Sequence, residues 1–217
     1  MAGSLKQAAK DRAYDFVKRQ VLRGAYEGGD LISEGDVSRE LQMSRTPVRE
    51  AFLRLETEGL LRLYPQRGAL VVPVSPGEIR AVLEAREVLE QFAVRKLIDG
   101  PASTREALDK ELAEHLGRQR ELLGVADVEG FLEQDRLFHS SMLTAAGNQL
   151  FSQFYTSLRD RQVRMVADSV VADPERSEAI LVEHAKIADA VRAGDAKRAQ
   201  AAVRAHLAST RAALGLA

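Results

Sequence analysis

The feature that most constrains this fold is the helical patterning that fills the chain after residue 75. The expected helices cover about residues 76–98, 103–123, 127–146, 149–172, 175–193 and 195–213. The breaks between them are short: DGPAS, GVAD, AGN, ADP and AGD. Because short loops join helices that run antiparallel to each other, residues 75–217 are predicted to form an all-α antiparallel helical bundle.

A domain boundary is expected just before this bundle, in the segment VVPVSPGEIR. Pro73 and Pro76 flank Ser75, and this arrangement suits a helix that begins with serine as its N-cap and proline at the first helical position. A chain of 217 residues is long enough for two domains. We therefore expect an N-terminal domain over residues 1–74 and the helical domain over residues 75–217.

The N-terminal segment has a different pattern. Its expected helices cover about residues 5–23, 34–42 and 45–58, with Ser33 and Ser44 as caps of the last two. Two β-rich runs, LLRLY and ALVVP, follow and flank the turn PQRG. A helix, a turn of about three residues, a second helix and a hairpin make a winged helix-turn-helix. The predicted fold class is mainly α, with this domain followed by the bundle.

The start of the 45–58 helix has the chemistry of a DNA-binding surface. In a helix-turn-helix, the N-terminal residues of the second helix enter the major groove. Here they include Ser44, Arg45, Thr46 and Arg49. The N-terminus of a helix can bind a phosphate. An arginine that forms two hydrogen bonds with guanine contributes about 1–3 kcal/mol of discrimination against other bases. The plainer alternative is that SRTP only caps an amphipathic helix.

The expected hairpin adds a second cationic contact. Arg67 precedes Gly68 at its tip, where a side chain can enter the minor groove. Charge alone is a weaker guide. Residues 1–75 hold 12 Lys+Arg and 10 Asp+Glu, and residues 76–217 hold 19 and 22, which gives net charges of +2 and −3.

Composition limits the cellular setting. The chain has no cysteine, which excludes disulfides and thiolate metal sites and fits a reducing compartment. Its apolar runs are far shorter than the ~20 residues of a membrane span, and the N-terminus has no apolar signal core. We therefore expect a cytoplasmic protein with no membrane partner.

Spacing groups three of the four histidines with one carboxylate. Asp135 and His139 are four residues apart on one helix face. His184 lies 10 residues before Gly194 in the AGD turn, and His206 lies 12 residues after it. At ~1.5 Å per residue, these two imidazoles are level across a helical hairpin. If the 127–146 helix packs alongside, all four side chains converge.

Such a ligand set suits a divalent transition metal. Three nitrogens and one oxygen favour zinc, and nickel, manganese, iron and cobalt also fit. Taken singly, each histidine is more often a core or surface residue than a ligand. His115 has no partner at a suitable spacing and is expected to be structural or exposed.

The segment SRTPVREAFLRLETEGLLRLYPQRGALVV resembles the GntR superfamily of bacterial transcription regulators, over about residues 8–74. The resemblance implies that Arg45, Thr46, Arg49 and Gly68 contact the operator.

The chain departs from this family pattern at the expected 34–42 helix. Many relatives carry an arginine early in that helix, where this chain has Gly35 and Asp36. No arginine is available for a phosphate contact from that position, and Arg39 is a candidate to replace it.

Residues 76–213 resemble the FCD effector domain of FadR-like GntR regulators, through AREVLE, DRLFH, AAGN, EH and RAH. The resemblance implies that a metal is bound by Asp135, His139, His184 and His206. That metal would form the floor of a pocket for a small, often carboxylate, effector.

Two further residues are candidates for effector binding. Arg86 can pair bidentately with a carboxylate, or can form a surface ion pair with Glu90. Asn148 can contact the effector, or can cap the helix that follows it.

The sequence therefore predicts a DNA-binding transcriptional regulator, in the first instance a repressor, that acts as a homodimer on a palindromic double-stranded operator. A small organic acid bound over the metal would modulate its operator binding. In one alternative, the metal ion itself is the signal. A remote alternative is a metal-dependent hydrolase, but Glu133 and Glu183 are not placed to act as its general base, and such an enzyme has no use for a winged domain.

Overall fold

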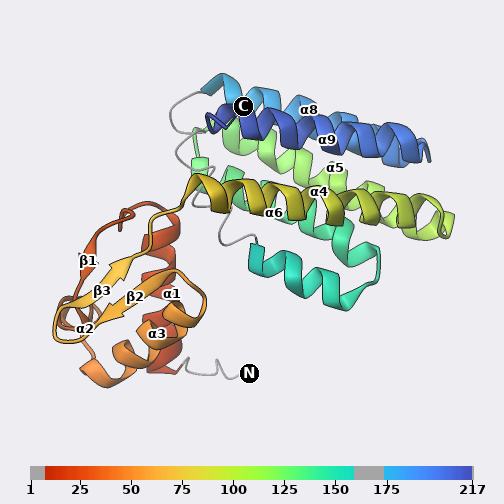
Figure 1. Ribbon diagram of the computed structural model, residues 1–217. Helices are drawn as coiled ribbons and strands as arrows, with labels where there is room; N and C mark the ends of the chain where they lie inside the picture. The colour runs from red at the N-terminus through yellow and green to blue at the C-terminus, as the bar shows by residue number, and fades with distance from the viewer. Residues whose placement is uncertain (1–7, 159–173, 217) are drawn as a thin grey trace, which may run out of the picture. The chain divides into compact units, whose positions relative to one another are not determined.

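The computed structural model describes residues 8–158 and 174–216. The chain divides into two compact units, Met1–Val74 and Ser75–Ala217 (Figure 1). Each unit has its own hydrophobic core, and each is described by itself.

The first unit is a three-helix domain with a small sheet, and the predicted fold class is confirmed. Its elements are α1 (Ala9–Leu22), β1 (Leu31–Ile32), α2 (Glu34–Glu40), α3 (Arg45–Thr57), β2 (Leu61–Tyr64) and β3 (Gly68–Val71). The sheet order is β1-β3-β2, and both pairings are antiparallel. The short strand β1 was not predicted, because two residues are too few to show alternation.

The second unit is a bundle of long helices (Figure 1). They are α4 (Pro76–Ile98), α5 (Ala102–Gly124), α6 (Val128–Ala145), α8 (Pro174–Arg192) and α9 (Ala196–Ala213). Residues 149–158 are also helical, and the rest of the expected 149–172 helix lies outside the described residues. Helix α5 packs against α6 and α8, and α9 packs against α4 and α8.

Local capping sets where most of these helices begin. Ser33 accepts a hydrogen bond from the Asp36 N–H at 3.0 Å, and Ser75 accepts one from the Glu78 N–H at 3.1 Å, with proline in the first turn. The expectation for Ser44 is wrong in one respect. This residue stands at the N-cap of α3, but its exposed side chain makes no capping hydrogen bond.

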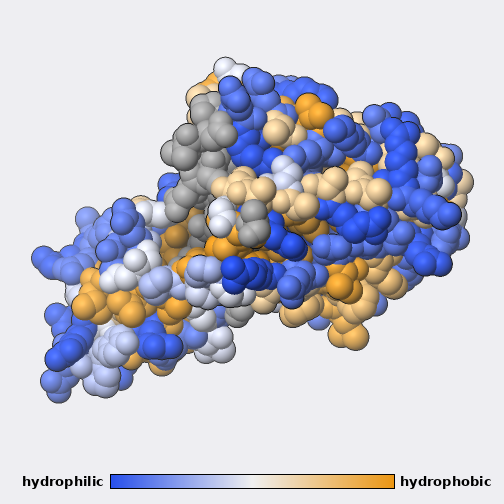
Figure 2. Space-filling model, turned by 45° about the horizontal axis from the view of Figure 1, so that its top comes forward, coloured by the Kyte–Doolittle hydropathy of each residue, from blue (hydrophilic) through white to orange (hydrophobic). Residues whose placement is uncertain are grey.

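The surface is mostly hydrophilic in the view of Figure 2, with hydrophobic side chains between the hydrophilic ones. None of the helices in the described part of the chain is long and apolar enough to cross a membrane.

Candidate metal site and DNA-binding surface

Helix α3 has one buried face and one exposed face. Val48, Phe52 and Leu55 are fully buried and hold the helix in the core of the first unit. Arg45 and Arg49, four residues apart, are both exposed. The apolar face therefore holds the helix in the core, while its N-terminal half exposes two arginines to solvent. Ser44 and Thr46 are exposed beside them.

The hairpin tip places Arg67 in solvent, next to a glycine that the sheet itself requires. Gly68 has a φ of +101°, and a Cβ there would collide with the carbonyl oxygen of Ile32 on the neighbouring strand. Glycine is the residue that tolerates this backbone. The identity of Gly68 thus has a structural cause, independent of any contact with DNA.

Helix α2 places its charges differently from the family pattern. The Arg39 guanidinium pairs with the Asp36 carboxylate, which also accepts a hydrogen bond from the Ser33 hydroxyl at 2.7 Å. The hydrogen bond from Ser33 and the contact with Arg39 lower the pKa of Asp36. Arg39 is therefore engaged within its own helix. At Gly35, a Cβ would lie 3.4 Å from a guanidinium nitrogen of Arg45, so Arg45 extends beside the start of α2.

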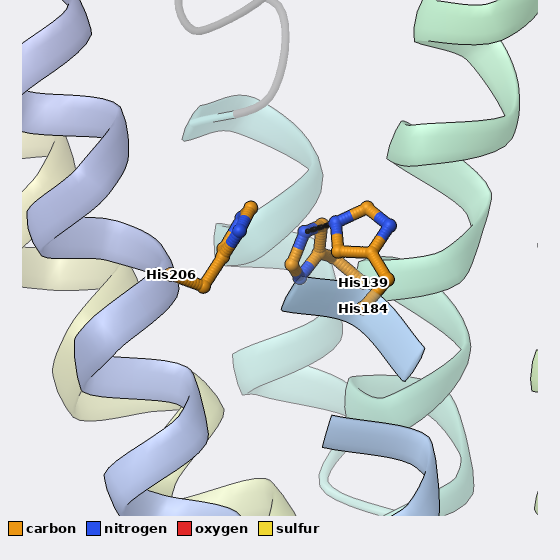
Figure 3. A group of neighbouring side chains, drawn as sticks. All are labelled: His139, His184 and His206. Carbon is orange, nitrogen blue, oxygen red and sulfur yellow. Dashed lines mark hydrogen bonds between the residues drawn. The ribbon is translucent and has the colours of Figure 1, made fainter. Parts of the chain in front are cut away.

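Three buried histidines meet in the second unit (Figure 3). His139 comes from α6, His184 from α8 and His206 from α9. One nitrogen of each lies within 4.8 Å of the others. The two helices joined by the turn at Gly194 therefore bring their histidines level, and α6 adds the third.

Each of these histidines has its Nδ1 atom held by an oxygen acceptor. Nδ1 of His139 lies 2.9 Å from Glu90 Oε2, Nδ1 of His184 lies 3.0 Å from Gln119 Oε1, and Nδ1 of His206 lies 2.8 Å from Glu183 Oε2. A carboxylate or amide oxygen can only accept, so each Nδ1 carries the proton. With the proton on Nδ1, the Nε2 atom of a neutral imidazole keeps its lone pair, as a metal ligand requires.

The inner atoms of the cluster fit a cation. The Nε2 atoms of His139 and His184 lie 3.1 Å apart. Two lone pairs this close repel each other unless a proton or a metal ion lies between them. Asp135 Oδ1 lies 3.4 Å from His184 Nε2 and 3.9 Å from His139 Nε2, so it can supply an oxygen ligand. The donor set is the one that zinc and its neighbours prefer.

Burial keeps two of these rings neutral. It lowers the pKa of His139 to about 4, because the effect of desolvation exceeds that of the Glu90 carboxylate. It also holds the pKa of His184 well below its usual value, and repulsion from neighbouring His139 and His206 acts in the same direction. Imidazole binds a metal in its neutral form, so these pKa shifts favour coordination.

Arg86 forms the expected pair with Glu90, but not at the surface. Both side chains are fully buried, and Arg86 Nε donates to Glu90 Oε1 at 2.7 Å. The same Glu90 oxygen accepts from the Tyr155 hydroxyl at 2.7 Å, and the other one accepts from His139. Although burial raises the pKa of Glu90, Arg86 and His139 outweigh it and hold that pKa well below its usual range. The two terminal nitrogens of Arg86 are buried with no hydrogen-bond partner among the described residues.

The remaining candidates have structural contacts. Asn148 Oδ1 accepts from the Phe151 N–H at 3.3 Å, so its side chain caps the 149–158 helix. His115 lies outside the cluster, with Nδ1 2.9 Å from Gln134 Oε1, which fits the structural role expected for it.

Sequence reasoning missed the residues that orient the histidines. Glu90 and Gln119 fall in register with the buried stripes of α4 and α5, and a polar residue in such a register was the available signal. Glu183 was considered only as a general base, but it hydrogen-bonds to His206 on the next helix.

A winged helix-turn-helix unit joined to an all-helical unit with a candidate metal site is typical of a DNA-binding regulator. Comparison with known proteins agrees. Residues 9–71 match the model of the gntR family of bacterial regulatory proteins, and residues 81–209 match the FCD domain. The chain belongs to the GntR family, in the group with an FCD domain, and is a transcriptional regulator rather than an enzyme.

Similar proteins cover nearly the whole chain. The HTH-type transcriptional repressor RspR of Escherichia coli is 28% identical over 204 residues, which are 93% of this chain and 86% of RspR. A regulator in an unstable DNA locus of Streptomyces ambofaciens is 31% identical over 202 residues, 89% of this chain and 80% of that protein. The solved structure of E. coli McbR/YncC superposes with a TM-score of 0.80 at 21% identity, over 96% of this chain and 98% of that one.

Proposed function

We propose that this regulator is a repressor that binds a palindromic operator as a homodimer, and that a small organic acid bound over a divalent metal ion modulates this binding. The observation that carries the proposal is the cluster of three buried imidazoles, each of which has its Nδ1 atom hydrogen-bonded to a residue outside the cluster. Repression is proposed by analogy with RspR, which is named as a repressor.

The first unit supports operator binding through α3 and the wing. Exposed Arg45, Thr46 and Arg49 stand at the start of α3, where a helix-turn-helix reads the major groove. Ser44 does not use its hydroxyl as a cap, so that hydroxyl is left for a phosphate. Exposed Arg67 serves the minor groove. Two copies related by a two-fold axis would read the two halves of a palindrome.

The metal would be held by His139, His184, His206 and Asp135. Three neutral imidazoles and one carboxylate leave a divalent ion with a net charge of +1 at these ligands. The ion, zinc in the first instance, would supply a Lewis-acidic positive charge for an anionic ligand. The protein's own part is to hold four donors in place and to exclude water from the imidazoles, which are 0–2% exposed.

Arg86 supports a carboxylate as the effector. Its two terminal nitrogens are buried and unpaired among the described residues, and a buried unpaired donor is costly unless a ligand satisfies it. A carboxylate accepts two parallel hydrogen bonds from a guanidinium. Glu90 links Arg86 to His139, so both groups belong to one network. Asn148, with its side-chain oxygen used as a cap, is the weaker effector candidate.

The test is operator binding with metal and effector varied separately. An operator is first selected from random DNA, and its affinity is measured for protein stripped of metal, reloaded with zinc, and reloaded with zinc in the presence of each of a panel of small organic acids. The proposal expects at least one acid to change the affinity of the zinc-loaded protein and not of the stripped protein. Acids that act equally on both forms would refute the role of the metal.

One alternative is that the metal ion itself is the signal. It is favoured by the donor set, because three imidazoles and the Asp135 carboxylate could fill four coordination positions without an effector. In the same assay it predicts a change on adding zinc alone, and no further change with any acid.

A further inference from the structure

A second network surrounds His206, on the opposite side of its ring from the metal-facing nitrogen. Glu183 accepts from His206 Nδ1 through Oε2 at 2.8 Å, and from Arg176 Nη1 through Oε1 at 3.0 Å. Arg176 also donates to the Ser209 hydroxyl at 2.8 Å and to the Thr210 hydroxyl at 3.0 Å. Arg176 is 8% exposed and the Glu183 side chain is 16% exposed, so these contacts are partly buried.

We propose that Glu183 and Arg176 are positioning residues of the metal site. Glu183 fixes the tautomer and orientation of His206, and Arg176 holds Glu183 in place. This inference rests on the metal site of the proposed function and adds residues to it that are not ligands.

The order of contacts resembles that around His139. There, Arg86 pairs with Glu90, and Glu90 accepts from His139 Nδ1. Around His206 the order is again arginine, glutamate, histidine, but the residues come from α8 and α9 instead of α4 and α6. In both cases an arginine pairs with the carboxylate that accepts a hydrogen bond from the imidazole.

The second network also joins two helices. Arg176 lies in the first turn of α8, and its hydroxyl partners Ser209 and Thr210 lie near the end of α9. Since His206 is one turn before Thr210 on α9, the same contacts that orient the ligand also hold the start of α8. Metal binding and the packing of this turn should therefore stabilise each other.

The experiment measures zinc affinity with zinc alone, by competition with a fluorescent chelator, in the full chain. Loss of a hydrogen bond to a metal-binding histidine typically lowers metal affinity about 10–100-fold. We expect Glu183→Ala to weaken zinc binding within that range. Glu183→Gln keeps an oxygen that accepts from His206, so it should recover most of the affinity. Arg176→Met should fall between them, and exposed Glu178→Ala on the same helix should bind as the wild type does.

A second readout needs no metal. Histidine nitrogen shifts of the metal-free protein report the tautomer of His206. We expect Nδ1 to be protonated in the wild type and in Glu183→Gln, and the alternative tautomer to become populated in Glu183→Ala. Circular dichroism identifies any variant that does not fold, and Glu183→Gln and Arg176→Met then decide the outcome.

The outcomes separate this inference from the proposed function. If the wild type binds zinc and Glu183→Ala binds it with the same affinity, the positioning role is overturned and the proposed metal site is not affected. A wild type that binds no zinc would refute the metal proposal, and the tautomers would then decide the positioning role. The same tautomer of His206 in the wild type and in Glu183→Ala would overturn it.

Discussion

Removing the Arg86 guanidinium should destabilise the second unit by an amount that the structure allows to be worked out. Arg86 and Glu90 are both fully buried, with 2.7 Å between Nε and Oε1. Arg86→Met retains most of the side-chain volume and removes the charge. Breaking a buried ion pair generally costs about 3–5 kcal/mol, because the remaining charge is left without compensation.

The expected loss lies at the lower end of that range. Glu90 keeps two hydrogen bonds in the variant, from His139 and from the Tyr155 hydroxyl. We therefore expect a loss of about 3 kcal/mol. For a chain of this size, each kcal/mol lowers Tm by roughly 2–4 °C, so the shift should be roughly 6–12 °C.

The assay is urea unfolding of metal-free protein, followed by circular dichroism. The control is Arg86→Met combined with Glu90→Gln, which removes the uncompensated charge and should restore more than half of the lost stability. A single variant that loses under about 1 kcal/mol would refute the reasoning, and so would a double variant that is no more stable than the single one.

Three further predictions concern the DNA surface and the metal. Arg49→Ala should weaken operator binding by about 1–3 kcal/mol in a gel-shift titration, with no change in Tm or metal content, whereas exposed Arg118→Ala on α5 should have no effect. Wild-type affinity in the first variant would remove Arg49 from the interface. His184→Ala should abolish zinc binding, as measured by elemental analysis. It should also abolish the stabilisation by zinc, which is about 2.7 kcal/mol at a zinc concentration a hundredfold above Kd. Full zinc content in this variant would contradict the ligand assignment. Arg67→Ala should reduce operator affinity without changing stability. Gly68→Ala should also destabilise the fold by about 1–3 kcal/mol, because residue 68 has a φ of +101°. If the two variants had the same Tm, the wing would not need glycine at this position.

Helix positions in this chain follow closely from the sequence, because the signals that end helices are local. The bounds of α4 agree with the expected 76–98 range, and Ser75 and Pro76 supply its cap and first turn. Gly194, with a φ of +69°, lies in the turn between α8 and α9. Strand β1 could not be found in this way, since it exists only through its pairing with β3.

Burial of the polar residues around the candidate metal site was harder to predict, because an Arg–Glu pair at i,i+4 looks the same on an exposed face and on a buried one. The position of the pair within the helix carries the missing information. In α4 the buried stripe passes through Val82, Arg86, Leu89, Ala93 and Leu97, in steps of three and four. An arginine in the centre of such a stripe is buried if the helix packs at all.

The same argument explains why α5 contributes to the site without supplying a ligand. Leu108, Leu112, Leu116 and Gln119 form one buried stripe, and only the last member is polar. The side-chain oxygen of Gln119 accepts from His184 Nδ1 at 3.0 Å, whereas its buried Nε2 has no hydrogen-bond partner among the described residues. In Gln119→Leu the stripe would become fully apolar, and the proton of His184 Nδ1 would lose its acceptor. That variant should therefore still fold in the absence of metal, at some loss of stability because the buried Nδ1 proton is left unpaired, and it should bind zinc more weakly than the wild type. If chelator competition showed unchanged affinity, the conclusion that the outer contact of His184 prepares it for a metal would be wrong.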